Sequence, residues 1–203
     1  MAEAPFSYIL VPVDFSPCSE EAFRVACDLA RLCRAEVLVV HVIDTSALAA
    51  FNRMGVLAVP SDAAAQKRRL RHFARLNVRR LLDSESAKGI EMDRLVLEGA
   101  PFVEIAKTAR VEKVDLVIMG SYGGRSGSVE KIFFGSTAEK VVRTAGCPVL
   151  TVPPRSAAVS AVGHYKSIVC AVDFSRASLA GLRYALSLAQ GTAARLVLVH
   201  GLD

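Results

Sequence analysis

The sequence predicts an α/β protein with a parallel sheet, and three observations support that prediction. Short apolar runs alternate with segments of helical periodicity between residues 8 and 152, which is the order of strands and crossover helices in such a sheet. The runs are continuous rather than alternating, as expected for strands that are buried on both faces. Each run ends near turn residues, beginning with Asp14-Phe15-Ser16-Pro17, and strand–helix–strand crossovers of this kind are right-handed.

The first half of the chain is predicted to hold two strands and two helices. In order, we expect a strand over 8–13, a helix over 19–33, a strand over 36–42, an excursion over 45–61 and a helix over 62–87. The first strand should stop near Pro12, which cannot donate a hydrogen bond to a sheet. The first helix is indicated by one apolar face, made by Ala22, Ala26, Leu29, Ala30 and Cys33. Lys88-Gly89 is expected to end the long helix.

The second half continues the alternation up to residue 152. In order, we expect a strand over 92–97, a helix over 101–111, a strand over 114–119, a short helix within 128–134, a helix over 136–144 and a strand over 148–152. Pro101 suits the first turn of its helix, where a missing N–H costs nothing. Ser136 and Glu139 have the spacing of a capping box at a helix start.

Composition limits the classes of protein that the chain can belong to. It has 203 residues, of which 52% are hydrophobic and 22% charged, with a net charge of +5. These values indicate a globular protein that suits anionic ligands. The five cysteines are an odd number without a CxxC pair, which argues against a disulfide framework or a zinc site. No secretory signal is recognised at the start, so we expect a cytoplasmic protein.

A glycine-rich stretch after the strand at 114–119 is the strongest candidate for a binding site. It begins at Gly120, includes Gly123 and Gly124, and leads to Gly135 at a predicted helix start. Glycines let backbone N–H groups approach phosphate oxygens, and a helix N-terminus favours negative charge. The stretch therefore predicts a phosphate site. The alternative is a surface loop that needs glycine only for its turns.

The chain begins to repeat itself after residue 164. The segment from Ile9 to Ser16 recurs from Ile168 to Ser175, and the same offset of 159 residues pairs His41 with His200. We therefore expect a domain at 1–153, a linker at 154–164 and an incomplete strand–helix–strand copy at 165–203. The copy has no glycine loop. Because so small a sheet is marginal alone, we expect it to pack on the first domain or on another chain.

These segments together resemble the universal stress protein family. The resemblance rests on Ile9-Leu10-Val11-Pro12-Val13-Asp14-Phe15-Ser16, on His41-Val42, on Asp115-Leu116-Val117-Ile118-Met119-Gly120-Ser121, on Gly135-Ser136 and on Cys147-Pro148-Val149-Leu150-Thr151-Val152. It implies a doubly wound, Rossmann-like sheet of the adenine nucleotide alpha hydrolase type with strand order 3-2-1-4-5. It also implies ATP binding, with Mg²⁺, at the carboxyl edge of the sheet.

The family's glycine signature is G-x2-G-x9-G-[ST], and this chain departs from it. Gly120 and Gly123 provide the first two glycines, but eleven residues rather than nine then precede Gly135. The resemblance carries the following cofactor-binding residues to this chain: Pro12, Val13, Asp14, Val42, Met119, Gly120, Ser121, Gly123, Gly124, Arg125, Gly135, Ser136 and Thr137. It implies that Asp14 binds the ribose. The structural alternative for Asp14 is an Asx turn before the first helix.

The leading hypothesis is an ATP-binding regulatory switch of the stress response, with at most slow hydrolysis because no general base is evident. A protein-interaction module of the same fold that has lost nucleotide binding is the alternative. No GxSxG, GxxxxGK[ST] or GxGxxG motif indicates a hydrolase, a P-loop NTPase or a dinucleotide dehydrogenase. We expect no catalytic residue and no metal site, and a homodimer through the edge strand 148–152.

A basic stripe on the predicted helix 62–87 raises a further alternative. Arg68, Arg71, Arg75 and Arg79 share one side of this helix. The pattern favours a solvated face paired with nearby acids, so we expect no membrane partner and disfavour nucleic acid. The alternative is that the stripe binds an anionic surface.

Overall fold

The computed structural model describes residues 6–45, 63–122, 135–153 and 165–201. Five parallel strands form one sheet in the order β3-β2-β1-β4-β5, which confirms the expected order. The strands are β1 (Tyr8–Pro12), β2 (Glu36–Asp44), β3 (Met92–Gly99), β4 (Leu116–Gly120) and β5 (Val149–Val152). Pro12 is the last residue of β1, opposite Val40, so the ladder stops there as predicted.

The helices of this domain lie close to their predicted positions. They are α1 (Pro17–Cys33), α3 (Ala63–Leu82), α4 (Pro101–Val111) and α5 (Ser136–Thr144). The long helix ends at Leu82 instead of residue 87, because a separate 3-10 turn, η1 (Glu85–Ala87), follows it. The excursion at 45–61 and the short helix at 128–134 fall almost entirely outside the described residues.

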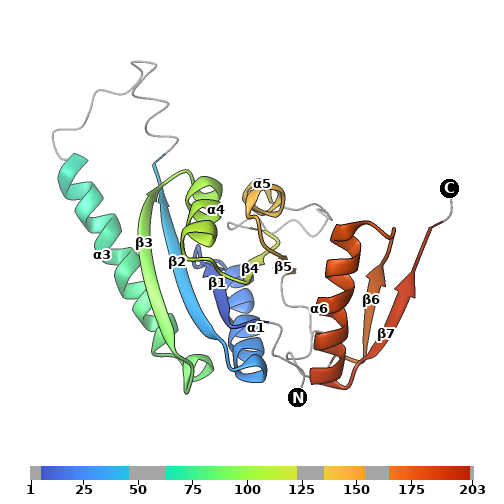
Figure 1. Ribbon diagram of the computed structural model, residues 1–203. Coiled ribbons are helices and arrows are strands. Elements are labelled where there is room, and N and C mark those ends of the chain that lie inside the picture. Colours follow the sequence, from blue (N-terminus) through green and yellow to red (C-terminus); the bar gives the residue numbers. More distant parts are fainter. Residues whose placement is uncertain (1–5, 46–62, 123–134, 154–164, 202–203) are drawn as a thin grey trace.

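The helices cover both faces of the sheet, so the fold is doubly wound (Figure 1). On one face, α1 and α3 bury Ile9 and Val11 of β1 in a core that also includes Val78 of α3. On the other face, α4 and α5 bury Leu10, with Ile105 and other apolar side chains. Adjacent residues of β1 thus face opposite cores, as expected where a continuous apolar run forms a central strand.

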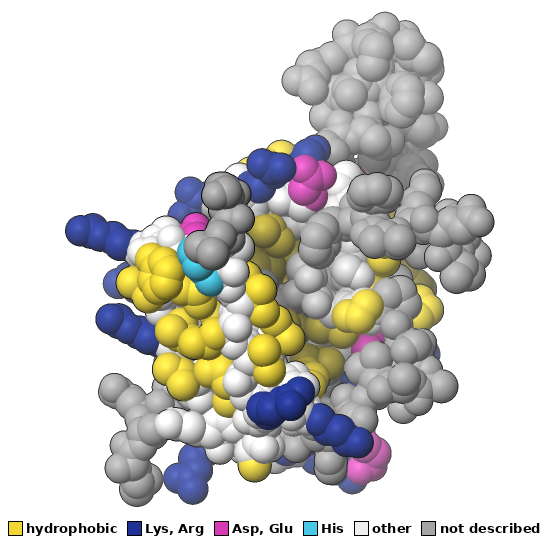
Figure 2. Space-filling view, turned by 90° about the vertical axis from the view of Figure 1, so that its right-hand side faces the viewer, with side chains coloured by type: hydrophobic (Ala, Val, Ile, Leu, Met, Phe, Trp, Pro, Cys, Tyr) yellow, Lys and Arg dark blue, Asp and Glu magenta, His cyan; other side chains and the backbone are white. Residues whose placement is uncertain are grey.

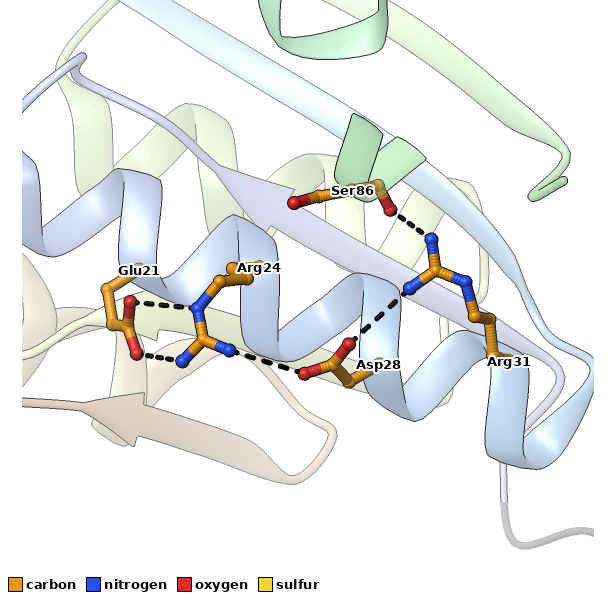
Figure 3. Close-up of polar contacts among 5 residues, drawn as sticks. All are labelled: Glu21, Arg24, Asp28, Arg31 and Ser86. Atoms are coloured by element: carbon orange, nitrogen blue, oxygen red, sulfur yellow. Dashed lines mark hydrogen bonds and ion pairs between the residues drawn. The ribbon is translucent and has the colours of Figure 1, made fainter. Parts of the chain in front are cut away.

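Helix α1 is defined by its two caps and by a polar outer face. The Ser16 side chain accepts a hydrogen bond from the Ser19 N–H, and Arg34 ends the helix in a left-handed conformation. On the outer face, Glu21, Arg24, Asp28 and Arg31 form successive ion pairs, and Arg31 also donates to the Ser86 carbonyl of η1 (Figure 3). This ladder connects α1 to the connection that follows α3.

A second unit is formed by β6 (Ser167–Ala171), α6 (Arg176–Thr192) and β7 (Arg195–Val199). It repeats the local geometry of β1, α1 and β2. Ser175 caps α6 through the Ser178 N–H, and β6 and β7 are parallel. The His200 Nδ1 lies 2.6 Å from the Val172 carbonyl, and the His41 Nδ1 lies 2.7 Å from that of Val13. The repeated sequence therefore folds into a repeated structure.

The second unit packs on the first through α6. Tyr184 stacks on Phe6, with ring centroids 5.3 Å apart and planes 8° from parallel. Leu188 also contacts the core that α1 covers, and Leu32 of α1 lies against Gly191. The segment therefore folds back on its own chain, which is one of the two arrangements that the sequence left open.

The opposite side of the second unit is apolar and exposed. Hydrophobic side chains gather on the side of the molecule that β6, β7 and α6 form (Figure 2). Val169 is 67% exposed, whereas Leu10 at the equivalent position of β1 is fully buried. The difference follows from covering: helices of the first domain pack over β1 and β2, and no described helix packs over this face of β6 and β7.

The repeat supplies a chemically matched test of this covering. Val40 is fully buried and its equivalent, Val199, is 50% exposed. We expect Val40→Ala to lower the free energy of unfolding by about 2 kcal/mol and Val199→Ala by less than about 1 kcal/mol. Urea unfolding of both variants measures the difference. Equal losses would mean that the Val199 side chain is covered in solution.

Candidate functional site

A cleft of about 300 Å³ opens at the carboxyl edge of the sheet, where β1 and β4 lie side by side. The chain leaves β1 toward one side of the sheet and β4 toward the other, so this is the switch point at which α/β sheets bind ligands. Its lining residues come from the ends of β1, β2 and β4 and from the starts of α1, α4 and α5: Pro12, Val13, Asp14, Ser19, Val40, Val42, Pro101, Ile105, Met119, Gly120, Tyr122, Gly135, Ser136, Thr137 and Ala138.

Asp14 stands at the rim of the cleft with an exposed carboxylate. Its Oδ1 accepts a hydrogen bond from the Ser16 N–H at 3.0 Å, which is an Asx turn. Asp173 makes the same bond to Ser175 at 2.9 Å in the second unit. The structural alternative for Asp14 is therefore present, but it uses only one of two carboxylate oxygens. Asp14 is the one charged residue in the described lining of the cleft.

His41 supports the turn after β1 through two contacts. Its Nδ1 lies 2.7 Å from the Val13 carbonyl, and its ring stacks on Phe15 at 4.5 Å between centroids. Phe15 has a φ of 62°, a left-handed conformation that is costly for a bulky residue. These contacts hold the Asp14 backbone at the cleft. Burial lowers the pKa of His41, and the bond to Val13 and the charge of Asp14 oppose that shift only in part.

The start of α5 also lines the cleft. Gly135 is the N-cap, and no side chain caps the helix. The predicted capping box is therefore wrong: Ser136 is the first helical residue, and Glu139 pairs with Arg143 instead. The consequence favours a ligand, because the first N–H groups of α5 have no side-chain acceptor and the Ser136 and Thr137 hydroxyls stand beside them in the lining.

The two ends of the glycine loop are joined at its base. Ser121 donates its N–H to the Val152 carbonyl and accepts from the Gly135 N–H, both at 2.8 Å. Ser121 is buried and does not line the cleft. Its contacts are structural, since they position β4 and the start of α5 relative to each other.

Gly120 lies in a tight contact with the first turn of α1. A Cβ atom on Gly120 would lie 3.0 Å from both the backbone carbon and the Sγ of Cys18. Cys18 itself is held in the first turn of α1 by a contact from its Sγ to the Val152 carbonyl at 3.2 Å. A side chain at residue 120 would therefore force the first turn of α1 to shift away from the end of β4.

The structure brings most of the predicted site residues into one cleft. Of those that it describes, the following line the cleft: Pro12, Val13, Asp14, Val42, Met119, Gly120, Gly135, Ser136 and Thr137. Ser121 is the exception. Gly123, Gly124 and Arg125 lie outside the described residues.

Sequence reasoning missed six residues of the lining: Ser19, Val40, Pro101, Ile105, Tyr122 and Ala138. Two of them carried a usable signal. Pro101 follows β3 at the same edge of the sheet as Pro12, and Tyr122 lies inside the glycine stretch. Val40 and Ile105 are apolar core residues with no distinguishing pattern.

The fold and the cleft define a class: a doubly wound α/β protein with a ligand cleft at the switch point. The model of the universal stress protein family matches residues 5–153. The chain is 31% identical to universal stress protein MJ0531 of Methanocaldococcus jannaschii over 147 residues, which are 72% of this chain and 82% of that protein. It is 34% identical to a universal stress protein of Thermus aquaticus over 148 residues, with 72% and 98% covered. The chain belongs to the universal stress protein family.

Solved structures agree with this assignment. Protein MJ0577 of Methanocaldococcus jannaschii, whose structure was used to assign its biochemical function, is 28% identical with a TM-score of 0.61, over 75% of this chain and 99% of that one. A universal stress protein of Archaeoglobus fulgidus matches in fold over 99% of this chain and 68% of its own, with a TM-score of 0.73 and 22% identity. Within the described residues, no helix has the length and apolar character needed to cross a membrane.

The lowered pKa of His41 has a consequence for stability below neutral pH. The unfolded chain binds a proton near pH 6.5, whereas the folded chain does so only at a lower pH. The stability that the neutral His41 contributes is therefore fully present above pH 6.5 and is lost as the pH falls through the folded pKa. We expect His41→Asn to flatten this loss in urea unfolding between those pH values. Titration of His41 by NMR at or above pH 6.5 would contradict the prediction.

Proposed function

We propose that this protein binds ATP, with Mg²⁺, in the cleft between the β1 turn and the start of α5, and acts as a nucleotide-dependent regulatory switch in the cytoplasmic stress response. The observation that carries the proposal is the lining of the cleft. It combines an exposed carboxylate, Asp14, with the N-terminus of α5, which no side chain caps. Family membership is consistent with it.

The residues present fit such a ligand. The Asp14 carboxylate suits ribose hydroxyls, and apolar side chains of Val13, Val40 and Val42 suit a base. The N–H groups of α5 and the hydroxyls of Ser136 and Thr137 suit phosphate oxygens. The described lining offers no Lys or Arg, so Mg²⁺ bound to the phosphates would neutralise their charge.

The proposed role is regulatory rather than enzymatic. Asp14 is the one carboxylate in the described lining, and the proposal assigns it to the ribose. No described side chain is therefore placed as a general base beside the phosphates. Any hydrolysis would be slow, and the bound nucleotide would act as the signal of the switch.

Mass spectrometry of gently denatured, freshly purified protein tests the proposal first, followed by calorimetry with Mg-ATP. We expect released adenine nucleotide, and an affinity weakened at least about tenfold in Asp14→Asn, which keeps an oxygen for the Asx turn and loses the charge. Asp173→Asn is the matched control, because it makes the same change in the second unit and should bind normally. Absence of nucleotide and of heat up to millimolar ATP would contradict the proposal.

That negative result would favour the alternative, an interaction module of the same fold without nucleotide. Its motivation is the glycine loop, which is two residues longer than the family pattern. Gly120→Val is a poor test for separating the two functions, because the new side chain would meet Cys18 whether or not a ligand binds. Thr137→Val, which removes one hydroxyl without changing the volume, is the better variant.

We further propose a homodimer through β5, which lies at the edge of the sheet. The Pro148 and Val152 carbonyls accept hydrogen bonds from β4 and the residue beyond it. Alternation along the strand then directs the Val149 and Thr151 N–H groups to the outer edge, and such an edge is a template for another strand.

The dimer can be tested by removing one outward N–H group. Thr151→Pro deletes that donor while leaving the bonds to β4 in place, so we expect it to shift light scattering of micromolar protein from dimer to monomer. Thr151→Val keeps the donor and should remain dimeric. A monomeric parent protein would contradict the proposal.

A further inference from the structure

The outer face of α3 combines exposed apolar side chains with arginines that form no ion pair within the described part of the chain. Ala74 and Val78 are buried against the sheet, whereas Leu70, Phe73 and Leu76 are 43%, 61% and 54% exposed. The helix forms the outermost layer on the β3 side of the molecule (Figure 1). Three large apolar side chains on one exposed helix are more than the scattered single residues of an ordinary surface.

The charge of α3 is of one sign. Its sequence holds seven Lys and Arg residues and no acid. Three of the seven find partners: Lys67 and Arg71 bind Glu98, and Arg79 lies near Asp83. The remaining four form no ion pair with any described residue: Arg68, Arg69, Arg75 and Arg80. The sequence predicted a solvated face whose basic residues pair with nearby acids. Within the described residues, fewer than half of these basic residues form such a pair.

Helical geometry places the apolar and basic groups together. At about 100° per residue, Leu76 projects roughly 160° away from the buried Val78. Arg69 and Arg80 fall between the directions of Leu76 and Phe73 on the same outward surface. The side chains that point farthest from the core are thus two arginines with an apolar side chain on either side of them in direction, and along the helix axis Arg69 and Arg80 lie on either side of Phe73 and Leu76. Helices that bind a lipid–water interface likewise offer apolar side chains to the acyl chains and Lys or Arg to the headgroups.

We propose that α3 docks the protein on an anionic lipid surface, with Phe73 and Leu76 inserted among the acyl chains and Arg69 and Arg80 at the headgroups. The four unpaired arginines match a negatively charged surface. The exposed Phe73 and Leu76 distinguish lipid from nucleic acid, since neither side chain contributes to phosphate contacts. This proposal departs from the expectation of no membrane partner, and it concerns attachment rather than spanning.

Co-sedimentation of the full chain with vesicles tests the proposal. We expect strong binding to mixed phosphatidylcholine–phosphatidylglycerol vesicles at low salt, weak binding to phosphatidylcholine alone, and about a tenfold loss at high salt. Leu76→Ser should lower the partition coefficient about tenfold, and Arg69→Gln combined with Arg80→Gln should do the same for anionic vesicles only. Equal binding to both vesicle types would overturn the proposal.

Matched controls separate insertion from loss of folding. Leu186→Ser removes an apolar side chain of similar exposure from α6, and binding should be unchanged. Phe73 contacts Phe15 edge-on, so Phe73→Ser could disturb the β1 turn and Leu76→Ser is the decisive variant. Soluble glycerophosphate and a short DNA duplex are the competing ligands. Binding to either that Leu76→Ser leaves intact, without vesicle binding, would assign the arginines to phosphate and overturn the lipid proposal.

Discussion

The burial of β1 on both faces is the constraint on which the rest of the structure depends. Ile9, Leu10 and Val11 have no exposed surface, because α1 and α3 cover one face and α4 and α5 cover the other. A strand covered on both faces lies inside the sheet, here between β2 and β4. The chain that leaves β1 crosses one face of the sheet, and the chain that leaves β4 crosses the other. The connections then diverge at the carboxyl end, and the cleft is the space that they leave.

The second unit separates what the β1 turn needs for folding from what it offers a ligand. Both units keep an aspartate in an Asx turn and a phenylalanine in a left-handed conformation. Both also keep a histidine whose Nδ1 lies at the carbonyl of the residue before that aspartate. Only the first unit adds β4 and the start of α5 beside that turn. The shared features are therefore architectural, and any binding function comes from what is placed opposite them.

The sequence predicted the sheet because each strand is a continuous apolar run, and the runs ended at the residues that line the cleft. It missed contacts that depend on distance in space. Gly120 was interpreted as a phosphate-binding glycine, yet Cys18, 102 positions earlier in the chain, also leaves little room for a side chain there. Ser121 read as a ligand residue, but its backbone groups joined β5 to α5. The ion pairing of the basic residues on α3 depends on which acids lie nearby in space, and helical periodicity alone does not identify those acids.

The hydrogen bond between Ser121 and Gly135 turns the glycine stretch into a loop with fixed ends. For a closed loop, the entropy of closure grows only with the logarithm of its length. Two additional residues in a loop of this size then cost about 0.2 kcal/mol or less. The departure from the family spacing therefore has almost no effect on the free energy of folding. The length of this segment can therefore vary without altering the hydrogen bonds that join its two ends.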